Sequence, residues 1–279
     1  MDSFFLSQQI GISGPLTVFD WPAPDSPPRG RVLLVHGLGE HMGRYAHVAE
    51  QLRAWGFAVR GYDQYGHGQS VGPRGDMKNA RSVMGDLGCV IDVTRKLTLA
   101  QGKPLIVLGH SMGGLIAGKV VADALRKVDG LVMSSPALAT DMNGFQKILL
   151  RLLPRLAPHL CVENGLKPQF VARDPQVVQD YLNDPLVHRK ISASLAEWIV
   201  TQGPQVLAKA AEWTTPTLLM YAGQDQLVAP RGSALFAASS PVCVRSKVFE
   251  TMYHEIFNDP EKQLVFDCLK DWLDEHFSA

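Results

Sequence analysis

Short apolar runs rich in β-branched residues alternate with amphipathic segments along most of this 279-residue chain. The clearest runs are RVLLV at 31–35, PLIVL at 104–108, GLVMS at 130–134 and TLLMY at 217–221. Such a run is typical of a strand buried on both faces of a parallel sheet. Segments with helical periodicity, such as 82–99, supply the crossovers that parallel strands need. The alternation therefore predicts a mostly parallel, doubly wound α/β sheet.

The alternation stops after residue 137 and resumes at residue 214. Between these points no buried strand is evident, and helical stretches at 146–153 and 191–201 are broken by prolines. We therefore expect a core whose first part is 1–137, a helical cap inserted at 138–213, and a second part of the core at 214–279.

Both ends of the chain carry further predicted elements. Two short strands are expected near 8–13 and 16–21, ahead of a proline-rich turn. A final helix is expected to start at Pro260, with Asp259 as its N-cap.

Composition excludes several classes of protein. Hydrophobic residues make up 46% and charged residues 19%, which argues against a disordered chain. Lys plus Arg equals Asp plus Glu at 27 each, so a main role in binding nucleic acid is not expected. The four cysteines lack metal-ligand spacing, and no secretory leader or apolar run of membrane-spanning length is evident. We expect a cytoplasmic protein with free thiols and no metal.

The sequence Gly109-His110-Ser111-Met112-Gly113 lies between the apolar run PLIVL and an amphipathic helical segment. A GxSxG motif at such a junction is typical of a nucleophile elbow, in which a tight turn holds the serine hydroxyl above the sheet. The backbone N–H of Met112 then points to the place where an oxyanion would form. Ser111 is therefore the candidate nucleophile.

A serine nucleophile needs a base that is itself oriented by an acid, and on this fold they follow in the order Ser, Asp or Glu, His. Asp225 follows the apolar run TLLMY, and His254 follows the predicted strand at 245–249. The other histidines that we weighed precede or adjoin the serine, lie in the insert or belong to the terminal helix. The predicted triad is Ser111, Asp225 and His254.

A second oxyanion donor is expected from the turn after RVLLV, which reads His36-Gly37-Leu38-Gly39. Glycines there let the backbone approach the substrate oxygen, and Leu38 is the candidate for the donating N–H.

Several longer segments resemble the monoacylglycerol lipase and lysophospholipase-like family of α/β-hydrolase serine enzymes. They are HGLGEHMGRY at 36–45, GYDQYGHGQS at 61–70, GHSMGG at 109–114, YLNDPLVH at 181–188, AGQDQLV at 222–228 and YHEIFND at 253–259. The resemblance runs from about residue 31 to the C-terminus. It implies an α/β-hydrolase fold in which the insert is a cap that covers the site and admits lipid.

The resemblance also implies a reaction: hydrolysis of monoacylglycerol to glycerol and fatty acid through an acyl-enzyme, without a cofactor. It gives Leu38 and Met112 as the oxyanion-hole residues and places Glu40, Arg44 and Tyr181 near the glycerol head group. The alternative for Glu40 and Arg44, which are four residues apart, is that they pair with each other.

Other functions stay open at this point. A lysophospholipase or a broad carboxylesterase would use the same triad, and a non-catalytic ligand receptor can share the fold. Asp63 and His67 are residue types that could act in catalysis, but we expect them to fix their loop by hydrogen bonds to the backbone. Cys161 is either a thiol near the entrance or a small apolar residue.

The insert also carries a basic amphipathic pattern. Lys147, Arg151 and Arg155 recur every four residues, with leucines on another face. Such a helix can make transient contact with a membrane surface. The alternative, which we favour, is that the leucines pack over the pocket and the basic face is solvated.

Overall fold

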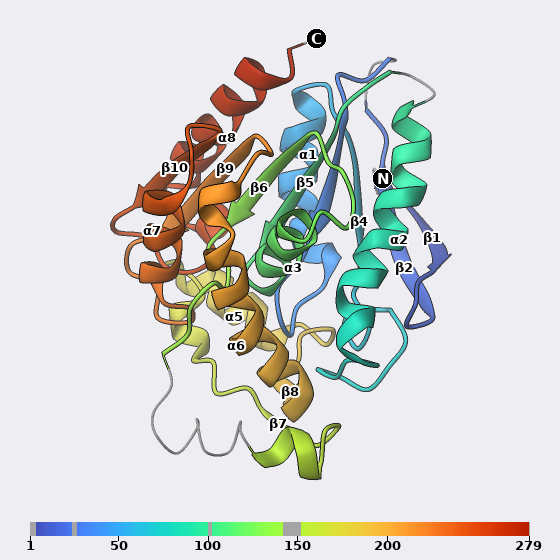
Figure 1. Ribbon diagram of the computed structural model, residues 1–279, viewed down its shortest axis with the longest axis vertical. Helices are drawn as coiled ribbons and strands as arrows, with labels where there is room; N and C mark the ends of the chain where they lie inside the picture. The colour runs from blue at the N-terminus through green and yellow to red at the C-terminus, as the bar shows by residue number, and fades with distance from the viewer. Residues whose placement is uncertain (1–3, 24–26, 100–101, 142–151, 279) are drawn as a thin grey trace.

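The computed structural model describes residues 4–23, 27–99, 102–141 and 152–278. At its centre these residues form an eight-stranded sheet in the order β1-β2-β4-β3-β5-β6-β9-β10 (Figure 1). The strands β1 and β2 pair antiparallel, as do β2 and β4, and every later pair is parallel. The predicted mostly parallel α/β architecture is thereby confirmed. The strands are β1 Phe5–Ile10, β2 Pro15–Trp21, β3 Arg31–Val35, β4 Ala58–Tyr62, β5 Leu105–His110, β6 Gly130–Ser134, β9 Thr217–Ala222 and β10 Val244–Phe249.

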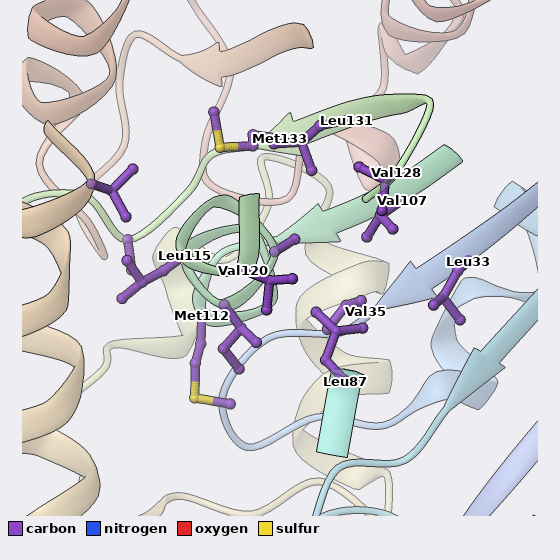
Figure 2. Packing of buried hydrophobic residues seen from close by; sticks show 14 of the residues in the cluster. Leu33, Val35, Leu87, Val107, Met112, Leu115, Val120, Val128, Leu131 and Met133 are labelled. Atoms are coloured by element: carbon purple, nitrogen blue, oxygen red, sulfur yellow. The ribbon is translucent and has the colours of Figure 1, made fainter. Parts of the chain in front are cut away.

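Helices cover both faces of the sheet. On one face lie α2 (Ala80–Leu99) and α3 (Met112–Ala122), whose side chains share an apolar core with those of β3, β5 and β6. Figure 2 shows part of this core, in which Val120 of α3 lies on the side of the helix that faces Val35 of β3. On the other face, α1 (Ala46–Ala54) and α8 (Lys262–His276) pack against the opposite side chains of the same strands. Because successive side chains of a strand alternate between faces, both layers are filled by one set of buried strands.

Most of the described residues between β6 and β9, which are neighbours in the sheet, lie at the lower end of the molecule in Figure 1. It includes β7 (Cys161–Glu163), β8 (Lys190–Ser192), α5 (Pro175–Asn183) and α6 (Ala193–Ala208). The first two pair with each other and stand apart from the main sheet. Shorter helices complete the fold: η1 Met42–Tyr45, η2 Pro168–Phe170, η3 Ala210–Glu212, α7 Pro230–Ser239 and η4 Ile256–Asn258.

Backbone hydrogen bonds attach this segment to loops of the core. The N–H of His188 donates to the carbonyl of Gly39 at 2.8 Å, and the N–H of Glu255 donates to the carbonyl of Val171 at 2.8 Å. Arg173 adds a two-pronged ion pair with Asp259. These contacts fix the inserted segment against two loops that carry candidate site residues.

Three local predictions are wrong. The strand predicted at 8–13 is β1, which ends at Ile10 because Gly11 starts a turn closed by its N–H to the carbonyl of Gly14. The final helix begins at Lys262 rather than at Pro260, because residues 260–261 form a turn, although Asp259 does accept from the N–H of Glu261 at 2.9 Å as an N-cap would. The helix α6 continues through Pro204, which is exposed, so the carbonyl freed by the missing N–H can face water.

Candidate active site

Ser111 occupies a sharp turn between β5 and α3. Its backbone has φ 53° and ψ −118°, a strained conformation for a residue with a side chain. Its N–H donates to the carbonyl of Ser134 at 2.9 Å, and its own carbonyl accepts from the N–H of Ala137 at 3.1 Å. The neighbouring strand thus holds the turn at both sides of the residue.

Glycines flank the turn because neighbouring backbone leaves no room for a side chain. A Cβ on Gly109 would lie 2.4 Å from the carbonyl oxygen of Gly113, and a Cβ on Gly113 would lie 2.2 Å from that of Val35. The helix α3 therefore starts directly against β3 and β5, and its N-terminal N–H groups lie beside Ser111.

The predicted acid and base meet at the same end of the sheet. Asp225 follows β9 and His254 follows β10, and the Nδ1 atom of His254 lies 2.6 Å from Oδ2 of Asp225. The other carboxylate oxygen accepts from the N–H groups of Leu227 at 2.8 Å and Val228 at 3.0 Å. Since a carboxylate only accepts, the proton between the two side chains belongs to Nδ1, which leaves Nε2 of a neutral ring able to take a proton.

Electrostatics around this pair follow from burial and charge. Burial acts to raise the pKa of Asp225, but His254 and the two backbone donors hold it below its usual value. Burial acts to lower the pKa of His254, and the charge and hydrogen bond of Asp225 raise it overall. The pair therefore favours an imidazolium once His254 has accepted a proton.

The turn His36-Gly37-Leu38-Gly39 lies against Ser111. A Cβ placed on Gly37 would be 3.1 Å from the Cβ of Ser111. Leu38 and Met112 both line the cavity that contains Ser111 and His254. The structure thus brings the two candidate oxyanion donors to the same wall as the candidate nucleophile and base.

Two unlike cavities meet at Ser111. The larger has a volume of about 450 Å³ and is lined mainly by apolar side chains. Its lining includes Leu153, Leu160, Val162, Ala196 and Ile199 from the segment between β6 and β9.

The smaller cavity, of about 20 Å³, has room for about one water-sized group. Glu40, Tyr181 and Glu255 lie on its wall together with Ser111 and His254. Ser111 therefore lines both a large apolar cavity and a small one that has two glutamates on its wall.

The three residues predicted near the head group lie together. Arg44 Nη1 is 2.7 Å from Oε2 of Glu40, and its guanidinium lies over the ring of Tyr181 at 4.9 Å from the centroid. Glu40 and Arg44 therefore do pair with each other, and Glu40 and Tyr181 also line the small cavity. Substrate contact by these residues stays a prediction.

Asp63 acts as expected on its loop. Its two carboxylate oxygens accept from the N–H groups of Met42 and Gln69, each at 2.7 Å. His67 has its Nδ1 2.9 Å from the carbonyl of Tyr65. Cys161 is half-buried on β7, and burial raises its thiol pKa, so it gains no thiolate character. Lys147 and Arg151 of the predicted amphipathic helix lie outside the described residues, whereas residues 152–156 are helical.

Two residues of the site were not singled out from the sequence. Glu255 forms a two-pronged ion pair with Arg44. The ring of His110 lies against that of His254, tilted by 54° with 4.7 Å between centroids, and burial lowers the pKa of His110 to about 3, so it stays neutral. The signal for Glu255 was its place directly after the base, but nothing in the spacing indicated its partner 211 residues away.

The described residues contain neither a metal-ligand cluster nor a membrane-spanning helix. No group of three or more histidine, cysteine, aspartate or glutamate side chains there could hold a metal ion. None of the described helices combines the length and apolar character needed to cross a membrane.

Comparisons with known proteins agree on one family. The model of the Hydrolase_4 family, described as "Serine aminopeptidase, S33", matches residues 26–261. The chain is 37% identical to a monoacylglycerol lipase of Mycolicibacterium smegmatis over 275 residues, an alignment that covers 95% of each chain. It is 30% identical to phospholipase YtpA of Bacillus subtilis, over 92% of this chain and 99% of that one.

Solved structures extend the likeness to three dimensions. A monoacylglycerol lipase of Paleococcus ferrophilus superposes with a TM-score of 0.83 at 33% identity, covering 94% of this chain and 99% of that one. A soluble variant of monoglyceride lipase from Saccharomyces cerevisiae, in complex with a substrate analog, gives a TM-score of 0.92 at 23% identity. It covers 100% of this chain and 97% of that one, and at this identity it shows a shared fold.

Proposed function

Because the chain belongs to the Hydrolase_4 family of serine hydrolases, we propose that it cleaves monoacylglycerol to glycerol and a fatty acid. The observation that carries this proposal is the position of Ser111 between a cavity of about 450 Å³ with mainly apolar walls and a cavity of about 20 Å³ whose wall includes Glu40 and Glu255. An ester with one acyl chain and a small hydroxylated alcohol matches this arrangement, because the acyl chain meets apolar walls and one hydroxyl of the alcohol can enter the small cavity beside the two carboxylates.

In the proposed mechanism, the Oγ atom of Ser111 attacks the ester carbonyl carbon while Nε2 of His254 accepts the hydroxyl proton. Asp225 holds the ring by its Nδ1–H and stabilises the imidazolium. The N–H groups of Leu38 and Met112 bind the oxyanion. When the tetrahedral intermediate collapses, His254 gives the proton to the leaving alcohol, and an acyl-enzyme remains. His254 then activates water, which releases the fatty acid and regenerates Ser111.

The small cavity supports a neutral leaving group. Glu40, Tyr181 and Glu255 lie on its wall, and Arg44 is already paired with both carboxylates. A hydroxyl of glycerol can donate to such a wall, so we propose Glu40 and Tyr181 as its contacts, with Arg44 fixing Glu40. A phosphate group would meet two carboxylates and a neutralised guanidinium, which disfavours a lysophospholipid.

The acyl chain is proposed to occupy the larger cavity beneath residues 138–213. These residues act in the proposal as a cap on a core formed by 1–137 and 214–279. Leu153, Leu160 and Val162 come from the cap and line the cavity. They supply apolar surface that favours burial of an alkyl chain.

A lipid surface is a proposed peripheral partner of the cap. Leu152, Leu156 and Leu160 have exposed fractions of 51%, 79% and 48%, and Leu160 also lines the cavity. Exposed leucines beside the entrance suit shallow contact with a bilayer that supplies substrate. Replacement of Leu156 by Ser should reduce co-sedimentation with phosphatidylcholine vesicles, and unchanged co-sedimentation would exclude this contact.

The substrate proposal is tested by measuring hydrolysis of a long-chain monoacylglycerol beside the lysophospholipid with the same acyl chain. Wild type and Ser111→Ala are compared at equal protein concentration. We expect the monoacylglycerol to be the better substrate and the variant to lose about 10³-fold or more in kcat.

Each other outcome has a distinct meaning. Preference for the lysophospholipid would retain Ser111 and overturn the argument from the acidic cavity. Turnover of short esters alone would replace the substrate proposal with a broad carboxylesterase.

A further inference from the structure

One arginine joins two buried glutamates that belong to different parts of the candidate site. Arg44 Nη1 lies 2.7 Å from Oε2 of Glu40 and 2.6 Å from Oε1 of Glu255, and its Nη2 lies 2.8 Å from Oε2 of Glu255. The exposed fractions of the three side chains are 11% for Arg44, 5% for Glu40 and 8% for Glu255. We refer to these three residues as the Glu40–Arg44–Glu255 bridge.

One end of the bridge holds the oxyanion turn. Oε1 of Glu40 accepts from the N–H of Gly37 at 2.5 Å and from the hydroxyl of Tyr45 at 2.7 Å. Gly37 directly precedes Leu38, whose N–H is the candidate oxyanion donor. A shift of the Glu40 carboxylate would therefore move the peptide that carries this donor.

The other end holds the loop of the base. Glu255 directly follows His254, and its Oε2 also accepts from Nδ2 of Asn258 at 2.7 Å. The N–H of Glu255 donates to the carbonyl of Val171 at 2.8 Å, so both its side chain and its backbone are fixed. Asp225 fixes the ring of His254, whereas Glu255 fixes the backbone from which that ring extends.

The charges of the bridge favour a geometric role over a stabilising one. Desolvation of buried ions offsets much of their attraction, and a well-packed apolar group of similar volume is often at least as stabilising. Two carboxylates around one guanidinium also leave an excess negative charge. What the arrangement does supply is direction, because a planar guanidinium that binds a carboxylate through two nitrogens fixes the orientation of both groups.

We propose that the Glu40–Arg44–Glu255 bridge is a positioning device that keeps the oxyanion turn and His254 in register with Ser111. The proposal rests on the proposed function, because it assumes that these groups perform the reaction. It assigns Glu255 a role in that reaction, and it gives Glu40 and Arg44 a task besides contact with the leaving alcohol.

A substrate without a glycerol head group separates positioning from substrate binding. In p-nitrophenyl butyrate the leaving group offers no hydroxyl donors to Glu40 or Tyr181, yet its hydrolysis needs the same nucleophile, base and oxyanion donors. Variants of the bridge are therefore assayed on p-nitrophenyl butyrate and on a monoacylglycerol.

The informative variants are Glu255→Gln, which removes one negative charge, and Arg44→Lys. The lysine keeps the positive charge but loses the planar guanidinium that binds a carboxylate through two nitrogens. The matched control is Arg60→Gln. Arg60 is also buried and binds Asp20 through two nitrogens, at 2.8 and 2.7 Å, but it lies on β4, which β3 separates from the strand that leads to Ser111. Circular dichroism and thermal unfolding give the folded fraction of each variant, so every rate is expressed per folded molecule.

We expect both bridge variants to lower kcat about 10- to 100-fold on both substrates, with KM changed less than about threefold. Labelling of Ser111 by a fluorophosphonate should slow in parallel, and Arg60→Gln should keep wild-type kcat per folded molecule. The proposal is overturned if kcat on p-nitrophenyl butyrate is unchanged, whether monoacylglycerol turnover falls or not. It is also overturned if activity falls only in proportion to the folded fraction.

The pH profile gives a second readout. The groups that face His254 are Asp225 after β9, His110 at the end of β5, and the charges of the bridge. Glu255→Gln removes a negative charge beside His254, so the acid limb of kcat/KM should move to lower pH. An unmoved limb would contradict the placement of this charge.

The two proposals fail in different ways. If wild type hydrolyses p-nitrophenyl butyrate but not monoacylglycerol, the proposed substrate is wrong, and the comparison between variants still tests the bridge. If wild type hydrolyses both and the variants match it, the bridge proposal alone is wrong.

Discussion

The Nδ1 atom of His254 lies 2.6 Å from Oδ2 of Asp225, although the two residues are 29 positions apart in the chain. The other oxygen of this carboxylate is occupied by the N–H groups of Leu227 and Val228. With both oxygens engaged, Asp225 has one orientation, and it presents the ring of His254 to the cavity that contains Ser111.

Replacement of Asp225 by Asn should lower kcat about 10³- to 10⁴-fold. An amide that keeps the two backbone bonds turns its NH₂ group toward Nδ1, which favours the tautomer with its proton on Nε2, so the ring cannot act as a base. Steady-state kinetics on a monoacylglycerol measure the loss. Asp92→Asn is the control, since Asp92 is half exposed and pairs with Arg126. A loss below tenfold for Asp225→Asn would contradict its orienting role.

Buried neutral histidines should make stability depend on pH. Burial lowers the pKa of His67 from 6.5 to about 3, and its Nε2 has no hydrogen-bond partner among the described residues. The unfolded chain therefore binds the proton first, so the stability from this group is present above pH 6.5 and is lost as pH falls toward 3.

The expected slope can be measured by urea unfolding between pH 6.5 and pH 4.5. His67→Gln should reduce the slope of the unfolding free energy against pH by about 1.4 kcal/mol per pH unit, the value for one proton. Equal slopes for wild type and variant would show that His67 also takes up its proton in the folded state.

The larger cavity should set the acyl chain preference. Ala196 lies on α6 and lines this cavity, so Ala196→Phe fills part of its volume. We expect kcat/KM to fall about tenfold or more for a long-chain monoacylglycerol and to change little for p-nitrophenyl butyrate. Ala208→Phe makes the same change on an exposed face of α6 and should have no effect on either substrate. Equal losses on both substrates would place the acyl chain elsewhere.

Gly113 should tolerate no side chain. A Cβ there would lie 2.2 Å from the carbonyl oxygen of Val35 and 2.4 Å from that of His36. Gly113→Ala should therefore displace the oxyanion turn or α3 and lower kcat about 100-fold or more.

The control, Gly88→Ala, adds its methyl group inside α2 with 3.8 Å to the nearest atom. It should raise stability by about 1 kcal/mol without changing kcat. Wild-type activity of Gly113→Ala would show that the turn adapts.

The parts of this fold that follow local rules could be predicted from the sequence. Buried parallel strands are continuous apolar runs, and the tight turn at Ser111 needs glycines, so sheet and candidate nucleophile were both recognisable. The order of the triad on this fold then selected Asp225 and His254. The pairing of Glu40 with Arg44 was one of two expected outcomes because four residues separate them.

Long-range contacts account for what was missed. Asp259 has the sequence signature of an N-cap and does accept from the N–H of Glu261, but it also binds Arg173, 86 residues earlier, which the sequence did not indicate. In the sequence Glu255 is only a charged residue next to the base. Its ion pair with Arg44 depends on the fold, which brings the two residues together. Pro204 breaks a helix by local rules, yet α6 continues through it because packing on both sides of the proline outweighs one lost hydrogen bond.

The most direct test of the central claim is intact-mass and peptide mass spectrometry of the protein after reaction with a fluorophosphonate. We expect a single adduct on the peptide that contains Ser111, no adduct on Ser111→Ala, and much slower labelling of His254→Ala. A stable adduct on another residue, or equal labelling of Ser111→Ala, would contradict the assignment of Ser111 as the nucleophile activated by His254.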